Sequence, residues 1–175
     1  NFLPMQKNVA PKLKKIITVS QSSKKDIIEE FQVLPENVEV ILNGIDINTF
    51  KPGSRELIKK NMIITTASAD IPLKGLKYLV QALPEIKKKF PGTKLTVIGK
   101  PPSNSEVSAL IDSLSLKDSI TFKSGISENE IVDLYHSSEI SVIPSLYEGF
   151  GFGAGEAKAC GVPLITTHSG GLKDV

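Results

Sequence analysis

Short runs of β-branched and aliphatic residues alternate along this 175-residue chain with longer segments of helical periodicity. The runs that predict strands lie at residues 16–19, 38–41, 62–67, 94–99, 119–122, 139–144 and 163–167. Strands separated by helical segments of about 10–15 residues indicate βαβ units and a parallel sheet. These strands are almost wholly apolar, as a sheet covered on both faces requires. The alternation therefore predicts an α/β fold, a Rossmann-like parallel sheet with helices on both faces.

The first βα pair is followed by a stretch of turn formers. After the first predicted strand, "SSKKDIIEEF" places its apolar residues on one helical face, and Ser22 or Ser23 is predicted to cap this helix. The dipeptide Asn43-Gly44 is a strong turn signal, and it opens the stretch "NGIDINTFKPGS" at residues 43–54. This composition predicts a linker between two structural units.

Composition narrows the classes of function. The net charge of +2 arises from 21 basic and 19 acidic residues, so no strong field would attract nucleic acid. Cys160 is the single cysteine, which excludes an internal disulfide framework and fits a reducing cytosol. No apolar stretch approaches the ~20 residues that cross a bilayer, and the N-terminus is no signal peptide. Because the chain begins without methionine and ends at "GGLKDV", we expect it to be part of a longer protein.

The most unusual loop at the expected ligand edge is "YEGFGFGAGEAKACGVP", residues 147–163. In parallel α/β folds, ligands bind outside the carboxyl ends of the strands, and this loop follows one of them. Gly149, Gly151 and Ala154 match the pattern G-x-G-x-x-A of dinucleotide-binding proteins. The surrounding sequence does not fit that class of protein. Its glycines should directly follow the first strand and an acidic residue should follow the next strand, and this chain meets neither requirement. An oxidoreductase is therefore the weaker interpretation of these glycines.

The same glycines also fit the start of a helix. "AGEAKAC" is predicted to be helical and to end at Gly161. Amides at the start of such a helix can bind an anion, for example a diphosphate. Glu148 lies before the helix and Glu156 about one turn inside it, so both carboxylates can face one pocket and bind sugar hydroxyls. The residues alone leave an alternative open, in which Glu148 is a surface residue and Glu156 balances the helix dipole.

The stretch "EGFGFGAGEAKACGVPLI" resembles the E-x₇-E motif of retaining glycosyltransferases with the two-domain GT-B fold, in particular glycosyltransferase family four. Other blocks fall in the order of that family: "IITVSQSSKKDI", "VEVILNGIDINTFKP", "PLKGLKYLVQALPEI", "KLTVIGK", "ITFKSGIS", "DLYHSSEISVIPSLYEGFGF" and "THSGGLKDV". The resemblance implies the C-terminal half of a GT-B fold. Residues 1–42 would be the tail of the N-terminal acceptor domain, 43–53 a hinge, and 54–175 a truncated C-terminal domain that binds the nucleotide sugar.

The resemblance also implies roles for the residues of this loop. Glu156 would hydrogen-bond the ribose hydroxyls of the donor, and Glu148 would hold hydroxyls of the transferred hexose. The backbone amides that would cradle the hexose and the diphosphate belong to Phe150, Gly151, Phe152 and Gly153.

Other predicted donor contacts lie outside that loop. Lys74, in "PLKG", matches the family lysine that neutralises the diphosphate, and Gly125 and Ile126 fall where main-chain groups receive the base. A lysine that only opens an exposed helix is the alternative for Lys74. The family often carries an arginine before this lysine, whereas Ser68 stands near that point here, so the bidentate arginine clamp is absent.

Together these features imply the donor-binding part of a retaining hexosyltransferase. The enzyme would move a hexose from a nucleotide-diphosphate sugar to an acceptor during glycan, glycolipid or polysaccharide synthesis. We expect no cofactor besides the donor substrate and no metal, because His168 lacks a partner at metal-ligand spacing and His136 lies in a predicted helix tail.

The acceptor would bind the missing N-terminal domain, so the 175 residues alone are expected to be inactive. The expected location is the cytoplasm, and this location is compatible with peripheral association of the full-length enzyme with the inner membrane surface. Two alternatives stay open: a non-catalytic subunit that binds nucleotide sugars, and a GT-B sugar epimerase. A hydrolase is disfavoured, since its two carboxylates must flank the scissile bond.

Overall fold

The computed structural model describes residues 3–68, 71–101 and 103–175, and the chain divides into two compact units. Unit 1 comprises Asn1–Gly44, Glu148–Gly151 and His168–Val175, whereas unit 2 comprises Ile45–Tyr147 and Phe152–Thr167. None of the helices in the described ranges is both long and apolar enough to span a bilayer. The domain division expected for the full-length protein, at residues 1–42, 43–53 and 54–175, stays a prediction.

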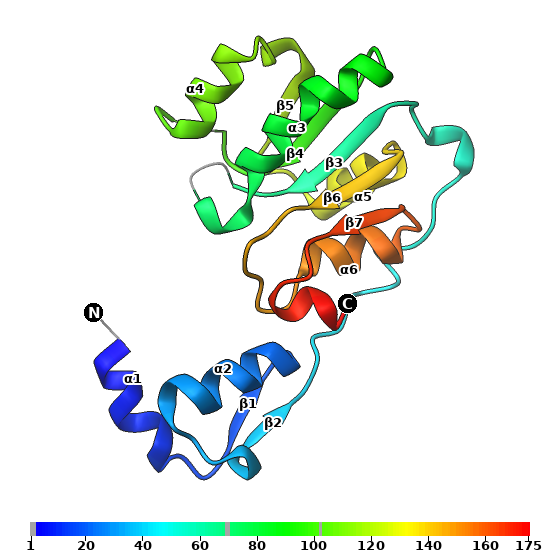
Figure 1. The fold of residues 1–175 in the computed structure, drawn as a ribbon. Coiled ribbons are helices and arrows are strands. Elements are labelled where there is room, and N and C mark those ends of the chain that lie inside the picture. The colour runs from blue at the N-terminus through cyan, green and yellow to red at the C-terminus, as the bar shows by residue number, and fades with distance from the viewer. Residues whose placement is uncertain (1–2, 69–70, 102) are drawn as a thin grey trace. The chain divides into compact units, whose positions relative to one another are not determined.

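Unit 2 is built on a five-stranded parallel sheet in the order β5-β4-β3-β6-β7 (Figure 1). The strands are β3 (Met62–Thr66), β4 (Lys94–Ile98), β5 (Ile120–Lys123), β6 (Ile140–Ile143) and β7 (Leu164–Thr166). The chain leaves β3 toward β4 and β5, then returns to the other side of β3 for β6 and β7. The carboxyl ends of β3 and β6 therefore form a topological switch point, where α/β folds bind ligands.

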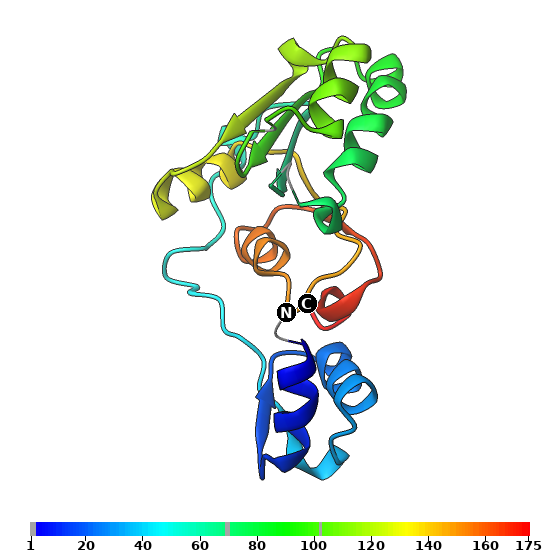
Figure 2. The same ribbon diagram turned by 90° about the vertical axis from the view of Figure 1, so that its left-hand side faces the viewer.

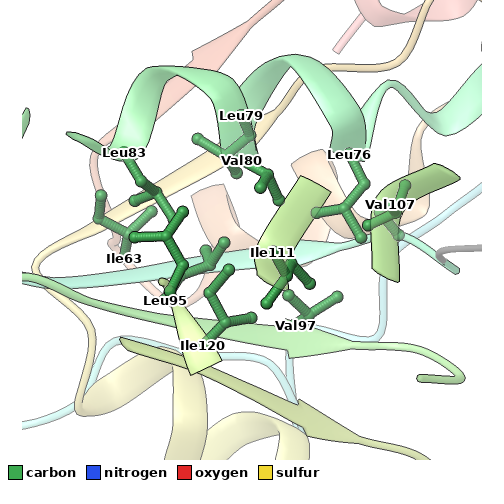
Figure 3. Packing of buried hydrophobic residues seen from close by; sticks show 12 residues of the cluster. Ile63, Leu76, Leu79, Val80, Leu83, Leu95, Val97, Val107, Ile111 and Ile120 are labelled. Carbon is green, nitrogen blue, oxygen red and sulfur yellow. The ribbon is translucent and has the colours of Figure 1, made fainter. Parts of the chain in front are cut away.

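One face of this sheet is covered by α3 (Leu76–Lys89) and α4 (Glu106–Ser113). The apolar side chains of α3 point toward the strands in Figure 3, at the spacing of one helical face. The buried residues of this core are Ile63, Ala67, Leu76, Leu79, Val80, Leu83, Leu95, Val97, Val107, Ile111, Leu116 and Ile120. Full burial of one such aliphatic side chain contributes about 1.5–3 kcal/mol, so this core supplies much of the stability of unit 2.

The opposite face is covered by α5 (Glu128–His136) and α6 (Phe152–Ala159), which confirms helices on both faces (Figure 2). Its core contains Phe50, Ile64, Tyr135, Ala157, Cys160 and Val162. A reciprocal capping box starts α5: the Ser127 hydroxyl accepts from the Glu130 amide at 3.3 Å, and the Glu130 carboxylate accepts from the Ser127 amide at 2.9 Å. These hydrogen bonds lower the pKa of Glu130.

Unit 1 contains α1 (Leu3–Val9), β1 (Ile16–Thr18), α2 (Gln21–Phe31) and β2 (Val38–Val40), and its two strands pair in parallel. The prediction that Ser22 or Ser23 caps α2 is wrong. Ser20 is the N-cap, since its hydroxyl accepts from the Ser23 amide at 3.0 Å and its backbone is extended, as an N-cap requires. The helix therefore begins at Gln21, and Ser22 and Ser23 lie in its first turn.

Candidate functional site

In unit 2, Lys74 lies on the switch-point edge of the sheet. It ends a 3₁₀ turn that follows β3, and its side chain is half-buried. The turn is held against the loop that leaves β6, because the Leu146 amide donates to the Leu73 carbonyl at 2.8 Å. A side chain at Gly75 would overlap the carbonyl oxygen of Pro144, so the two segments approach closely. Lys74 is thus presented next to the segment that leads toward the glycine-rich loop.

Helix α6 starts at the same edge and packs directly on the end of β3. It begins at Phe152, earlier than the predicted segment "AGEAKAC", so Phe152 and Gly153 occupy its first turn. Amides in a first helical turn have no hydrogen-bond partner within the helix itself. A β-carbon at Gly153 would overlap Oγ1 of Thr66, the last residue of β3. Glycine is therefore the residue that lets α6 begin this close to the sheet.

Glu156 lies on α6 with its carboxylate half-buried. The Tyr135 hydroxyl on α5 is 3.2 Å from Oε2 of Glu156 and 3.1 Å from the Gly153 carbonyl oxygen. Burial raises the pKa of Glu156, the Tyr135 hydrogen bond lowers it, and the Glu128 charge raises it. Burial also raises the pKa of Tyr135, and the Glu156 charge adds to that effect, so the phenol stays neutral. The site thus holds a carboxyl group whose ionisation is sensitive to what binds it.

The predicted base contacts, Gly125 and Ile126, lie in the loop between β5 and α5. Gly125 is exposed with a positive φ of 66° and has open space at its α-carbon, while Ile126 is half-buried. This loop leads into α5, the helix that carries Tyr135 and Glu128. Lys74, Gly125 and the start of α6 therefore all follow carboxyl ends of strands in one sheet.

In unit 1, the loop Glu148–Gly151 carries the remaining predicted donor contacts. The Gly171 amide donates to the Glu148 carbonyl at 2.7 Å, and a side chain at Gly170 would overlap that same carbonyl. Phe150 is buried, with an exposed fraction of 8%. The Glu148 backbone is thus fixed by the Gly170-Gly171 pair. Glu148 and Glu156 belong to different units, and the single pocket expected for the two carboxylates stays a prediction.

The first turn of α2 also holds this part of unit 1. The Ser22 hydroxyl donates to the Gly170 carbonyl at 3.0 Å, and the Gln21 amide donates to Oδ2 of Asp174 at 2.8 Å. Through Gly170, Ser22 supports the segment that fixes Glu148. Ser22, which the sequence pattern suggested as a cap, instead makes a tertiary contact that local patterns do not reveal.

Two residues at the candidate site in unit 2, Tyr135 and Thr66, were not predicted from the sequence motifs. A signal existed for Tyr135, since it lies four residues after Ile131 and shares its helical face. No local signal pairs it with Glu156, because the two residues are brought together by the packing of α5 beside α6.

The chain has two histidines, His136 and His168. His136 ends α5, with Nε2 2.7 Å from the Lys51 carbonyl oxygen, and His168 is exposed. Within residues 3–68, 71–101 and 103–175, no three His, Cys, Asp or Glu side chains gather as metal ligands would. The expectation that the enzyme needs no metal stays a prediction.

The fold and the edge of unit 2 define the class of protein. A five-stranded parallel sheet flanked by helices, with its switch point between β3 and β6, matches the Rossmann-like domains of GT-B glycosyltransferases. The solved HepE protein of Anabaena, in complex with UDP and glucose, superimposes with a TM-score of 0.81 at 23% identity. The match covers 98% of this chain and 49% of that protein.

The family follows from the sequence comparison. The profile of the family described as "Glycosyl transferases group 1" matches residues 48–175, and the chain belongs to that family. An MMP alpha-(1->4)-mannosyltransferase of Mycolicibacterium hassiacum is 38% identical over 99% of this chain and 42% of its own length. An uncharacterized glycosyltransferase of Methanocaldococcus jannaschii is 30% identical over 91% of this chain and 44% of its own length. The chain thus spans less than half of each of these relatives.

Proposed function

We propose that this chain is the C-terminal, donor-binding part of a retaining glycosyltransferase of family four, which transfers a hexose from a nucleotide-diphosphate sugar to an acceptor. The observation that carries the proposal is the switch-point edge of unit 2, where Lys74 and the first turn of α6 follow the neighbouring strands β3 and β6. The family match over residues 48–175 supports it. A relative named as a mannosyltransferase makes mannose the first hexose to test.

In this proposal, leaving-group stabilisation is the main chemical contribution of the chain. The diphosphate gains negative charge as the bond to the hexose breaks, and Lys74 together with the amides of Phe152 and Gly153 offers positive charge to it. Electrostatic groups that are already in place when charge develops usually form the largest catalytic contribution. A charge-assisted contact of this kind contributes about 1.5–3 kcal/mol.

The two glutamates are assigned to positioning. Glu156 binds the ribose hydroxyls and Glu148 binds hydroxyls of the hexose, while the amides of Phe150 and Gly151 complete the cradle. The amides and carbonyls near Gly125 receive the base.

The proposal extends to the whole protein. No metal or further cofactor takes part, and the acceptor binds an N-terminal domain that these residues do not include. The chain alone therefore binds the donor weakly and transfers nothing. The reaction lies in the cytoplasm, at the inner membrane surface, where a glycolipid or polysaccharide acceptor would be met. The single cysteine fits that compartment.

A calorimetric titration tests the proposal. The chain is titrated with UDP-, GDP- and ADP-hexoses, including mannose and glucose forms, and so are the variants Lys74→Ala and Glu156→Ala. We expect saturable binding of one nucleotide, about tenfold or more weaker in each variant. Lys89→Ala is the matched control, because Lys89 is an exposed lysine at the other end of α3. Equal affinity of Lys74→Ala and Lys89→Ala would contradict the assigned role of Lys74.

A further inference from the structure

One hydroxyl group in unit 2 contacts two predicted donor-binding features at once. Tyr135 is fully buried on α5, and its ring packs in the core with Ile64 and Ala157. Its hydroxyl lies 3.1 Å from the carbonyl oxygen of Gly153 and 3.2 Å from Oε2 of Glu156. Gly153 and Glu156 are three positions apart on α6, so one hydroxyl group contacts two successive turns of that helix.

The number of hydrogen bonds that these three groups can form with one another depends on the charge of Glu156. The Tyr135 hydroxyl carries one hydrogen, whereas the Gly153 carbonyl and an ionised Glu156 are both acceptors. One of the two acceptors then receives nothing from the hydroxyl. If Glu156 carries a proton, it donates to the Tyr135 oxygen and Tyr135 donates to Gly153. The protonated form thus joins all three groups by two hydrogen bonds, beside the hydrogen bond between Tyr135 and the Thr66 side chain.

The surroundings of Glu156 raise its pKa above the ordinary value and so shift its ionisation toward that protonated form. Among the described residues, the titratable groups that act on it are Glu128 and Tyr135 on α5 and Cys160, which directly follows α6. Burial and the negative charge of Glu128 raise the pKa of Glu156, and the Tyr135 hydrogen bond opposes them. Burial also raises the pKa of Cys160 to about 11, so this thiol adds no charge at neutral pH. Among these groups, Tyr135 is the one that stabilises the carboxylate.

We propose that Tyr135 is a positioning residue for Glu156, whose hydroxyl turns from the Gly153 carbonyl to the carboxylate when a vicinal diol binds. The inference rests on the proposed function, in which Glu156 binds the ribose of a nucleotide sugar. A diol brings two O–H donors to the carboxylate and therefore favours its ionised form. The proton of Glu156 leaves for the solvent as the ligand binds. Affinity should accordingly rise with pH until Glu156 is ionised in the free chain and stay constant above that point.

The first arm of the test needs no ligand. The pKa of Glu156 is measured by carboxyl ¹³C NMR in the wild-type chain and in Tyr135→Phe, with Glu156→Gln used to assign the resonance. We expect a higher pKa in Tyr135→Phe, because the variant keeps the ring and removes the donor. Tyr78→Phe is the matched control, since Tyr78 is 53% exposed on α3. An unchanged Glu156 pKa in Tyr135→Phe overturns the proposal.

If Tyr135→Phe does not fold, the wild-type chain labelled with 3-fluorotyrosine replaces it. The label keeps each hydroxyl and makes it a stronger donor, so the pKa of Glu156 should fall. An unchanged pKa in the labelled chain is again decisive against Tyr135. Thermal unfolding by circular dichroism shows which of the two routes applies.

The second arm measures binding of UDP-, GDP- and ADP-hexoses by calorimetry, in buffers of different ionisation enthalpy and across a pH series. Wild type should release protons on binding where the pH lies near or below the pKa of Glu156, and Tyr135→Phe should bind more weakly, by up to about tenfold, with its pH profile moved upward. Binding of the variant with wild-type affinity and profile refutes the positioning role. If wild type binds none of the donors while the NMR difference is present, the proposed function fails and the pairing of Tyr135 with Glu156 stands.

Discussion

Gly153→Ala should destabilise unit 2, although alanine is the better helix former. Gly153 lies in α6, where replacing glycine by alanine ordinarily stabilises by about 1 kcal/mol. Here the added β-carbon would overlap Oγ1 of Thr66 and lie 3.0 Å from Cβ and 3.2 Å from Cγ2 of the same residue. Threonine is branched at Cβ, so rotation of the side chain brings another group toward the helix. The strain must be taken up by moving α6 away from β3.

The expected change in the free energy of unfolding of Gly153→Ala is the sum of two opposing contributions. Overpacking of a filled interior costs about 1–3 kcal/mol, against the gain of about 1 kcal/mol from helix propensity. The expected net loss is about 1 kcal/mol in the free energy of unfolding. Thr66→Ala removes Oγ1 and Cγ2 and leaves only Cβ near the added group, so Gly153→Ala should be less costly in that background, or stabilising. Gly155→Ala is the matched control within α6, because its β-carbon would meet the flexible end of Ile45 at 2.9 Å.

Urea unfolding followed by tyrosine fluorescence measures these changes in unit 2. The chain has no tryptophan and three tyrosines, and Tyr78, Tyr135 and Tyr147 all lie within Ile45–Tyr147 of that unit. The four chains of the cycle give the coupling energy between Gly153 and Thr66 directly. The reasoning is refuted if Gly153→Ala is as stable as wild type and shows no coupling to Thr66.

Three further predictions use the same chain. Ser22→Ala removes the donor to the Gly170 carbonyl, so it should cost about 1 kcal/mol and speed hydrogen exchange of amides 168–174, measured by mass spectrometry. The folded state raises the pKa of Glu156 above its ordinary 4.5, so it binds the proton more tightly than the unfolded state. Wild type should therefore lose stability relative to Glu156→Gln as pH rises through the window above 4.5, measured by urea unfolding across a pH series. Leu83→Ala, at a fully buried position, should cost about 2–5 kcal/mol in the same urea assay.

The strands and the fold class could be predicted because they depend on local periodicity. The run at residues 62–67 became β3 at Met62–Thr66, and the run at 139–144 became β6 at Ile140–Ile143. Local periodicity could not predict that β3 and β6 are neighbours in the sheet. Pairing between strands so distant in sequence is decided by the packing of the whole sheet, and this pairing creates the switch point.

The start of α2 shows where local rules do not decide. Ser20, Ser22 and Ser23 all have side chains that can cap a helix, and the sequence pattern favoured the two later ones. Ser20 follows β1 closely and keeps an extended backbone, so the helix begins after it. Ser22 is then used by a segment far away in sequence, through its hydrogen bond to the Gly170 carbonyl. Capping propensity ranks residue types and does not include such a contact.

The E-x₇-E spacing pointed to Glu156, but the chemical state of that carboxyl group comes from elsewhere in the chain. Its own helix provides the position on α6. Tyr135 and Glu128 come from α5, and their effects on the pKa of Glu156 have opposite signs. The motif would be intact in a chain with phenylalanine at position 135, but Glu156 would then lose the Tyr135 hydrogen bond, which lowers its pKa. A motif match that ignores α5 therefore identifies the carboxyl group without establishing whether it is charged when the donor arrives.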